Sequence, residues 1–183
     1  MSTRPTRPTR PRSDLVGIGL GSNLGARAAI LRGAIGDLER LLGELEVAPL
    51  YRTVPVSPID QPDFYNTVVL GVLRRGPDGV PVPAPEEILA YGKTLERAAG
   101  RRRGARFGPR PLDVDLLFVG DLRRDGPELT LPHPRLAERR FVLAPLADLR
   151  PDLRLPPEGK TVRRLLAALG KAQAVERISW NDA

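Results

Sequence analysis

Two aspartates at the start of an apolar segment are the side chains of this sequence best placed to do chemistry. The stretch "RFGPRPLDVDLLFVG" (residues 106–120) sets Asp113 and Asp115 two positions apart, in a run that predicts a strand over 112–119. On a strand, both carboxylates point to the same side. Mg²⁺ prefers such hard oxygen ligands and leaves coordination positions open for phosphate oxygens. The same spacing also fits two solvated aspartates or the partners of nearby arginines.

A basic cluster lies directly before these aspartates and supports the first interpretation. Guanidinium groups match the geometry of phosphate oxygens, and phosphoryl transfer needs charge neutralisation and alignment more than covalent help. A basic loop that only meets solvent is the alternative. The cluster comprises Arg101, Arg102, Arg103, Arg106 and Arg110.

Net charge and composition bound the protein class. The formal net charge is +7, and it falls to +3 without the four arginines of residues 1–13. We expect these residues, "MSTRPTRPTRPRS", to be a disordered Arg/Pro/Thr tail ahead of one domain at 14–183.

The absence of cysteine excludes thiolate catalysis and cysteine-bound zinc, and favours the cytoplasm. No apolar run approaches the length of a membrane span, and no apolar stretch of a signal peptide follows the N-terminal charges, so we expect no membrane partner.

The order of the predicted elements is β-α-β-β-α-β. This order indicates an α+β fold with a ferredoxin-like core, in which an antiparallel sheet lies between helices and extra helices follow at the C-terminal end. Asn23 is a candidate cap for the first helix. The elements are a strand in "DLVGIGLGSN", a helix from Leu24 to Leu42, strands at 45–52 and 64–73, a helix at 85–99, the strand at 112–119, an extended piece at 129–131, a helical turn or two within 135–149, and a helix at 161–169.

Three further features permit both a functional and a structural interpretation. Phe64 and Asn66 share one strand face and would suit a flat heterocycle, or they are a core ring and an amide that satisfies loop backbone. His133 lies between two prolines and is either a turn residue or a phosphate contact with Arg139. "GLGSNLG" fits neither a dinucleotide-binding nor a P-loop pattern, so its glycines indicate close packing.

Four stretches, taken in order, resemble the hydroxymethyldihydropterin pyrophosphokinases of folate biosynthesis. They are "GLGSNLG", "YRTVPVSPIDQPDFYNTVV", "RFGPRPLDVDLLFVGD" and "LTLPHPRLAERRFVLAPL", and the likeness covers about residues 15 to 157. The resemblance implies a pyrophosphokinase domain at 14–183. It further implies transfer of the β,γ-pyrophosphate of ATP to the hydroxymethyl group of a reduced pterin, with release of AMP.

The resemblance also implies a role for individual residues. Asp113 and Asp115 would hold two Mg²⁺ ions on the ATP phosphates, with Arg101 and Arg110 as catalytic arginines. The implied ATP contacts are Glu96, Arg103, Phe107, Arg110, Thr130, His133 and Arg139. The implied pterin contacts are Thr53, Val54, Val56, Phe64, Asn66 and Phe141, with the heterocycle stacked between the two phenylalanine rings.

Two other functions stay open on the residues alone. An RNA-binding module would fit the basic charge, but the sequence lacks an aromatic-rich strand of the kind such modules use, so nucleic acid is not an expected partner. A magnesium-dependent nucleotidyltransferase could use the same aspartates, and it would release pyrophosphate instead of AMP. We expect ATP and a reduced pterin as partners, and a monomer or weak dimer.

Overall fold

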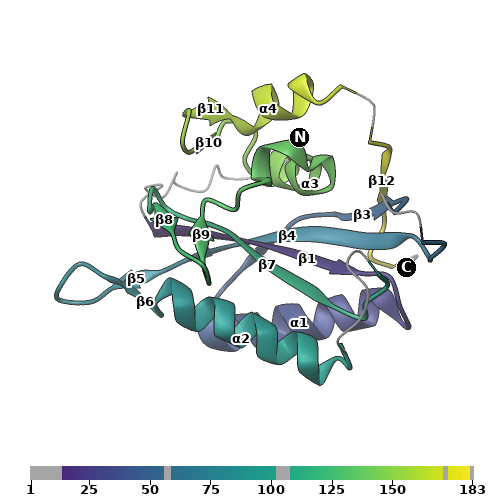
Figure 1. The fold of residues 1–183 in the computed structure, drawn as a ribbon, viewed down its shortest axis with the longest axis horizontal. Coiled ribbons are helices and arrows are strands. Elements are labelled where there is room, and N and C mark those ends of the chain that lie inside the picture. Colours follow the sequence, from purple (N-terminus) through teal and green to yellow (C-terminus); the bar gives the residue numbers. More distant parts are fainter. Residues whose placement is uncertain (1–13, 56–58, 102–107, 171–172, 182–183) are drawn as a thin grey trace, which may run out of the picture.

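The structure is a computed structural model that describes residues 14–55, 59–101, 108–170 and 173–181. An antiparallel sheet forms the middle layer (Figure 1), with helices α1 (Arg27–Leu42) and α2 (Pro85–Ala98) against one face. Helix α3 (Arg140–Leu149) covers the opposite face, and α4 (Val162–Ala168) packs on α3. The expected combination of an antiparallel sheet with helices is confirmed.

The main sheet has the strand order β12-β3-β4-β1-β7, with β2 also paired to β4. Every pair is antiparallel. β1 lies between β4 and β7. Within the described ranges β7 ends the sheet, and one of its edges pairs with no strand. The bounds are β1 Leu15–Ser22, β2 Glu46–Val47, β3 Leu50–Thr53, β4 Phe64–Val72, β7 Asp113–Val119 and β12 Val175–Ile178.

Three short hairpins and one 3₁₀ turn complete the described part of the chain. The extended piece expected at 129–131 is confirmed as one strand of the second hairpin. The hairpins pair β5 Arg74–Arg75 with β6 Pro81–Val82, β8 Arg124–Asp125 with β9 Thr130–Leu131, and β10 Arg154–Leu155 with β11 Lys160–Thr161, and the 3₁₀ turn is η2 Leu136–Glu138.

Helix α1 starts later than its periodicity predicts. It begins at Arg27 behind Ala26, and no side chain caps it, so the expected cap at Asn23 is wrong. The side chain of Asn23 is buried and hydrogen-bonded to two loops instead. The helix ends as expected, because Gly43 takes a positive φ of 79° that favours glycine.

Strand pairing differs from the expectation at two places. The predicted strand at 45–52 is split into β2 and β3, since Pro49 between them has no N–H to donate to a ladder. Strand β12 was not predicted at all. Its four residues, "VERI", carry too short an alternation to stand out, and their partner β3 lies more than a hundred positions earlier.

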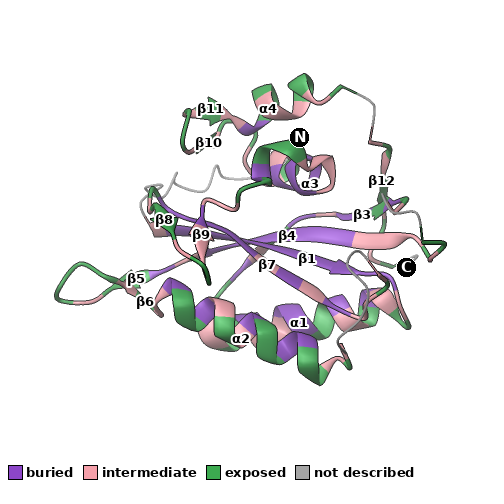
Figure 2. Ribbon diagram, viewed as in Figure 1, coloured by how far each residue is buried: buried purple, intermediate pink, exposed green. Residues whose placement is uncertain are grey.

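The sheet has a hydrophobic core on each face, and Figure 2 shows its strands buried over much of their length. Val16, Ile18 and Leu20 of β1 face α1 and α2, and the alternating glycines leave the other face of β1 bare. Strict alternation along 112–119 predicts Phe118 on the same face as Val114, but a register shift beside Gly17 brings its ring to the α3 side. A Cβ on Gly17 would lie only 2.3 Å from that ring.

No helix among the described residues combines the length and the apolar character that crossing a bilayer requires.

Candidate active site

Asp113 and Asp115 lie on the α3 side of β7, where arginines from before β7 and before α3 contact them. Oδ1 of Asp113 is 2.7 Å from Nη1 of Arg101 and 3.5 Å from Nη1 of Arg110. Oδ2 of Asp115 is 2.5 Å from Nη1 of Arg139, which immediately precedes α3. Each carboxylate therefore faces at least one arginine of its own, which offsets the cost of holding two like charges on one strand.

Glu96 supports this strand from the side of α2. It is 3% exposed, and Oε1 accepts the backbone N–H of Val114 (2.9 Å) at the edge of β7 that pairs with no described strand. The same oxygen lies 2.6 Å from Nη1 of Arg101 and 3.1 Å from Nζ of Lys93. The three-residue spacing of Lys93 and Glu96 is typical of a surface ion pair, but here the pair belongs to a partly buried network.

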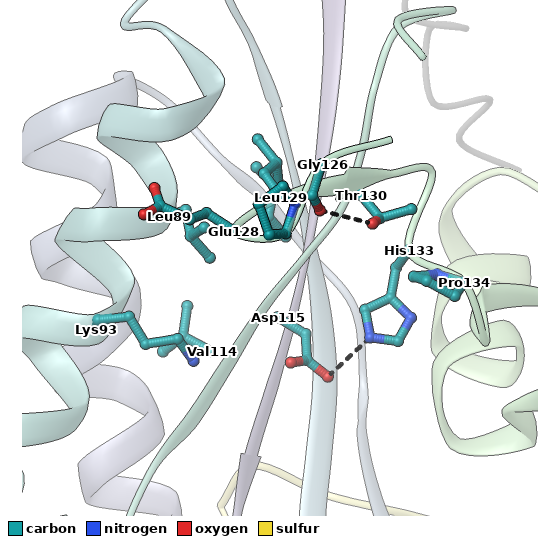
Figure 3. Close-up of a pocket in the computed structure, with 12 residues that line it drawn as sticks. Leu89, Lys93, Val114, Asp115, Gly126, Glu128, Leu129, Thr130, His133 and Pro134 are labelled. Atoms are coloured by element: carbon teal, nitrogen blue, oxygen red, sulfur yellow. Dashed lines mark hydrogen bonds and ion pairs between the residues drawn. The ribbon is translucent and has the colours of Figure 1, made fainter. Parts of the chain in front are cut away.

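A cavity of about 200 Å³ opens beside Asp115, between α2, β7 and the β8–β9 hairpin (Figure 3). Nε2 of His133 lies 4.0 Å from Oδ2 of Asp115, and the two side chains point toward each other across the cavity wall. Burial, and then the charge of Arg139, lowers the pKa of His133 below its usual value, so the ring is neutral near pH 7. The other polar residues of the lining are Lys93, Glu128 and Thr130.

A second, narrower cavity of about 20 Å³ lies on the α3 side of the sheet. Its floor is the bare backbone of Gly19 and Gly21 on β1, which pair with Asp115 and Asp113 of β7. On the opposite side Gly21 pairs with Asn66 of β4. Because glycine has no side chain, a gap is left between the amide of Asn66 and the carboxylates of Asp113 and Asp115. Phe141 of α3 covers this gap.

The two cavities meet at Asp115, which lines both. Asp113 lines the narrow cavity only. Because the shared aspartate stands between a larger polar cavity and a slot with an aromatic wall, two different ligands would approach each other at this carboxylate.

The remaining residues with an implied pterin contact differ in their relation to the narrow cavity. Thr53 is buried, and its Oγ1 accepts a hydrogen bond from Nδ2 of Asn66 (2.8 Å). The guanidinium carbon of Arg110 lies 5.5 Å from the ring centre of Phe64. Val54, in contrast, is 67% exposed and lines neither cavity. Val56, Arg103 and Phe107 lie outside the described residues.

Over residues 17–151 the sequence matches the 7,8-dihydro-6-hydroxymethylpterin-pyrophosphokinase (HPPK) family. The chain belongs to this family. The resemblance drawn from the four quoted stretches is therefore confirmed, and the paired aspartates lie within the matched range.

Individual relatives differ in how much of them the chain covers. It is 39% identical over 163 residues to the 2-amino-4-hydroxy-6-hydroxymethyldihydropteridine pyrophosphokinase of Pseudomonas aeruginosa, covering 88% of this chain and 94% of that protein. It is 47% identical over 135 residues to the mitochondrial folate synthesis bifunctional protein of Arabidopsis thaliana, covering 72% of this chain. The chain thus spans only 23% of that plant protein.

Solved structures of HPPK relatives share the fold. A crystal structure of Plasmodium falciparum HPPK-DHPS superposes with a TM-score of 0.63 at 17% identity, covering 87% of this chain and 45% of that one. A second structure of the same Plasmodium protein, the S436F/A437G/A613T triple mutant with pteroate, gives a TM-score of 0.64 over 93% of this chain and 48% of that one. The chain spans about half the length of these proteins.

Asn23 and Gln61 are neighbours of the site that were not predicted from the sequence. Both ends of the Asn23 amide are hydrogen-bonded, to Arg110 on one side and to Gln61 and Pro62 on the other. A signal was available in the sequence, since Ser22 and Asn23 are polar residues at the end of an otherwise apolar and glycine strand. Because the same pattern is also typical of a helix start, it predicted a cap and not a site residue.

Proposed function

We propose that this protein transfers the pyrophosphoryl group of ATP to the hydroxymethyl group of 6-hydroxymethyl-7,8-dihydropterin, giving the pterin diphosphate and AMP, in folate biosynthesis. Membership of the HPPK family supports the reaction class. The observation that carries the proposal is the place of Asp115, on the wall of both cavities and 2.5 Å from Arg139. A nucleotide and a heterocycle held in separate cavities would bring their reacting ends together at this carboxylate.

We assign ATP to the larger cavity and its phosphates to the arginines around the aspartates. Thr130 and His133 line that cavity, and the neutral imidazole can donate one hydrogen bond to a phosphate oxygen. Arg110 gives further support, because its Nε is buried with no hydrogen-bond partner among the described residues. An unpartnered buried N–H is costly, and a phosphate oxygen would satisfy it. Arg103 and Phe107 remain assigned to ATP by the resemblance alone.

We assign the pterin to the narrow cavity. Asn66 offers both a donor and an acceptor to the edge of a heterocycle, Thr53 orients that amide, and Phe141 supplies an aromatic wall. Phe64 is the candidate second wall. Since about 20 Å³ cannot hold a two-ring ligand, side chains lining the slot must move when the pterin binds. Val54 and Val56 stay assigned to the pterin edge through the resemblance.

The two aspartates suit Mg²⁺ ions that are bound by the phosphates of ATP at the same time. No group of three or more histidine, cysteine, aspartate or glutamate side chains in the described part of the chain could hold a metal alone. Mg²⁺ does not need such a cage, because it binds through one or two carboxylates together with water and substrate phosphates. Two ions held by Asp113 and Asp115 would supply charge neutralisation and alignment of the phosphoryl oxygens.

The residues then act mainly by position and charge. The hydroxymethyl oxygen attacks the β-phosphorus in line, the bond from the β-phosphorus to the α,β-bridging oxygen breaks, AMP leaves, and the hydroxyl proton passes to solvent. Arg101, Arg110 and Arg139 would stabilise the negative charge that develops on the bridging and terminal oxygens. For that they must exchange part of their contact with the aspartates for contact with the phosphates.

The finer fold, location and assembly belong to the same proposal. The order β3-β4-β1-β7, with α1 and α2 as the two connecting helices, supports a ferredoxin-like core. A chain without cysteine suits the cytoplasm. We further expect a monomer or weak dimer, with no role for nucleic acid or a membrane.

The test is a product assay on the purified protein with ATP, Mg²⁺ and the reduced pterin. AMP and the pterin diphosphate should appear in equal amounts by chromatography and mass spectrometry. Omission of the pterin, or addition of a chelator in excess of Mg²⁺, should stop AMP formation. Pyrophosphate as the released product would indicate nucleotidyl transfer, and ADP would indicate single phosphoryl transfer; either result would refute the proposal.

A further inference from the structure

Helix α3 takes its first hydrogen-bond acceptor from a glutamine more than thirty positions later in the chain. Within the described part of the chain, the side chain of Arg139, which precedes the helix, does not cap it. Instead, the backbone N–H of Arg140 donates to Oε1 of Gln173 (2.9 Å). Nε2 of Gln173 donates to the carbonyl of Glu138 (3.0 Å). One amide thus spans Arg139 and joins the end of η2 to the start of α3.

The segment that Gln173 holds carries two residues of the candidate active site. Nη1 of Arg139 lies 2.5 Å from Oδ2 of Asp115, and Phe141 lines the narrow cavity. The guanidinium carbon of Arg139 is 5.6 Å from the ring centre of Phe141. Gln173 itself lines neither of the two cavities described above, so it would act on a ligand there through these neighbours.

The first turn of α3 depends on this outside contact because a proline weakens the helix from within. Pro145 has no N–H, so the carbonyl of Phe141 receives no hydrogen bond from the residue four positions later. The helix is only 10 residues long, and short helices gain little stability from their own backbone bonds. Loss of the contact with Gln173 would therefore loosen the first turn more than the rest of α3.

The segment that supplies Gln173 is itself attached to the main sheet. Two positions later, Val175 begins β12 and pairs with Thr53 of β3. The guanidinium of Arg140 also donates to the carbonyl of Gly170, which follows α4, and α4 packs on α3. The Gln173 amide therefore links the start of α3 to the edge of the sheet that carries Thr53.

We propose that Gln173 is a positioning residue that fixes Arg139 and Phe141 against the site. This inference rests on the proposed function, because it assigns Arg139 to the phosphates and Phe141 to the pterin. Without the Gln173 amide, the N–H of Arg140 loses its acceptor and the first turn of α3 can shift, which moves the guanidinium and the ring together. A displacement of about 1 Å is enough to slow a reaction that depends on alignment.

The experiment compares the steady-state kinetics of Gln173→Ala with those of a variant that is weakened elsewhere. In Gln173→Ala, kcat/KM for the pterin should fall about tenfold, through a lower kcat and a higher KM. Thr161→Ala removes the side-chain cap of α4, where Oγ1 of Thr161 accepts the N–H of Arg164. Loss of this cap should lower the thermal midpoint by a similar amount, but should leave kcat and both KM values unchanged.

Two further variants test how Gln173 acts. Gln173→Glu keeps an acceptor for the N–H of Arg140, and a negative charge suits a helix start, so kcat/KM for the pterin should return to within about threefold of wild type. In a Phe141→Ala background, Gln173→Ala should raise the KM for the pterin by less than about twofold, because the ring that it positions is gone. Gln173 is partly exposed, so we expect these substitutions to leave the protein folded.

Three results would each overturn the positioning role. They are kinetic changes in Gln173→Ala no larger than those in Thr161→Ala, no recovery in Gln173→Glu, and a full increase in the KM for the pterin in the absence of the Phe141 ring. In each case AMP formation by the wild-type protein would still support the proposed function. A wild-type protein that forms no AMP with ATP, Mg²⁺ and the reduced pterin overturns both.

Discussion

Glu96 of α2 accepts the backbone N–H of Val114, the residue between the two aspartates of β7, at 2.9 Å. The bond spans two elements and leaves the carboxylate 3% exposed. Its position makes Glu96 a support for the strand that carries Asp113 and Asp115, in addition to any contact with ATP.

Glu96→Ala should therefore reduce stability as well as turnover. It leaves the N–H of Val114 unpaired and removes a partner of Arg101, which together cost roughly 1–3 kcal/mol of unfolding free energy. Denaturant unfolding followed by circular dichroism measures this loss. Glu86→Ala is the matched control, because Glu86 lies on the same helix in an exposed pair with Arg124 and should change stability by less than about 1 kcal/mol. Equal effects of the two substitutions would refute the supporting role.

Asp115→Asn should nearly abolish AMP formation while the fold survives. The amide keeps the shape of the side chain but loses the charge that faces Arg139 and that Mg²⁺ requires. We expect a fall in kcat of at least about 100-fold, the scale of a single electrostatic contact in a transition state. Asp152 forms an exposed pair with Arg163, and neither residue lines a cavity, so Asp152→Asn should keep full activity. Wild-type turnover in Asp115→Asn would rule out the metal assignment.

Gly21→Ala should weaken the pterin side selectively. A Cβ at Gly21 would lie 2.9 Å from Oδ1 of Asn66, so the amide must move away from its position beside Thr53. We expect the KM for the pterin to rise about tenfold, with the KM for ATP nearly unchanged. Gly33→Ala on the open face of α1 meets no atom and should stabilise the protein by about 0.5–1 kcal/mol without affecting either KM. Equal increases in the two KM values of Gly21→Ala would contradict this assignment.

Tyr51 should contribute to the unfolding free energy, and this contribution should be lost in strong alkali. Burial, and then the hydrogen bond to Asp148 (2.8 Å), raises the pKa of Tyr51 from 10.0 to about 12. Between these values the unfolded chain loses the phenolic proton and the folded chain keeps it, so stability falls as the pH rises from 10 toward 12. The difference in unfolding free energy between wild type and Tyr51→Phe should be constant below pH 9 and shrink above pH 10. A difference that is independent of pH would show that the phenol titrates normally.

Local pattern was enough to predict much of the scaffold. The alternation of apolar residues and glycines in β1, and the three-and-four spacing in α1 and α2, depend on near neighbours in the sequence, so they could be recognised without coordinates. The same holds for Asp113 and Asp115, whose two-residue spacing places them on one strand face whatever surrounds them.

The failures occur where a distant partner decides the outcome. Asn23 has the features of a helix cap, yet its amide binds Arg110 and Pro62, because these acceptors and donors are brought to the end of β1 by the fold. Phe118 changes face because β7 shifts register against β1, a property of the pair of strands. β12 exists as a strand only through its pairing with β3.

By itself, the sequence determined the order of the main elements, the family, and the pair of aspartates on one strand face. Only the tertiary structure decided that Asp115 stands between two cavities, that Glu96 supports the strand beneath it, and that Asn23 joins two loops. The physical reason is that strand periodicity and charge spacing are set by adjacent residues. Cavities and buried hydrogen bonds, in contrast, require segments far apart in the chain to meet in a dry interior, where each polar group must find a partner.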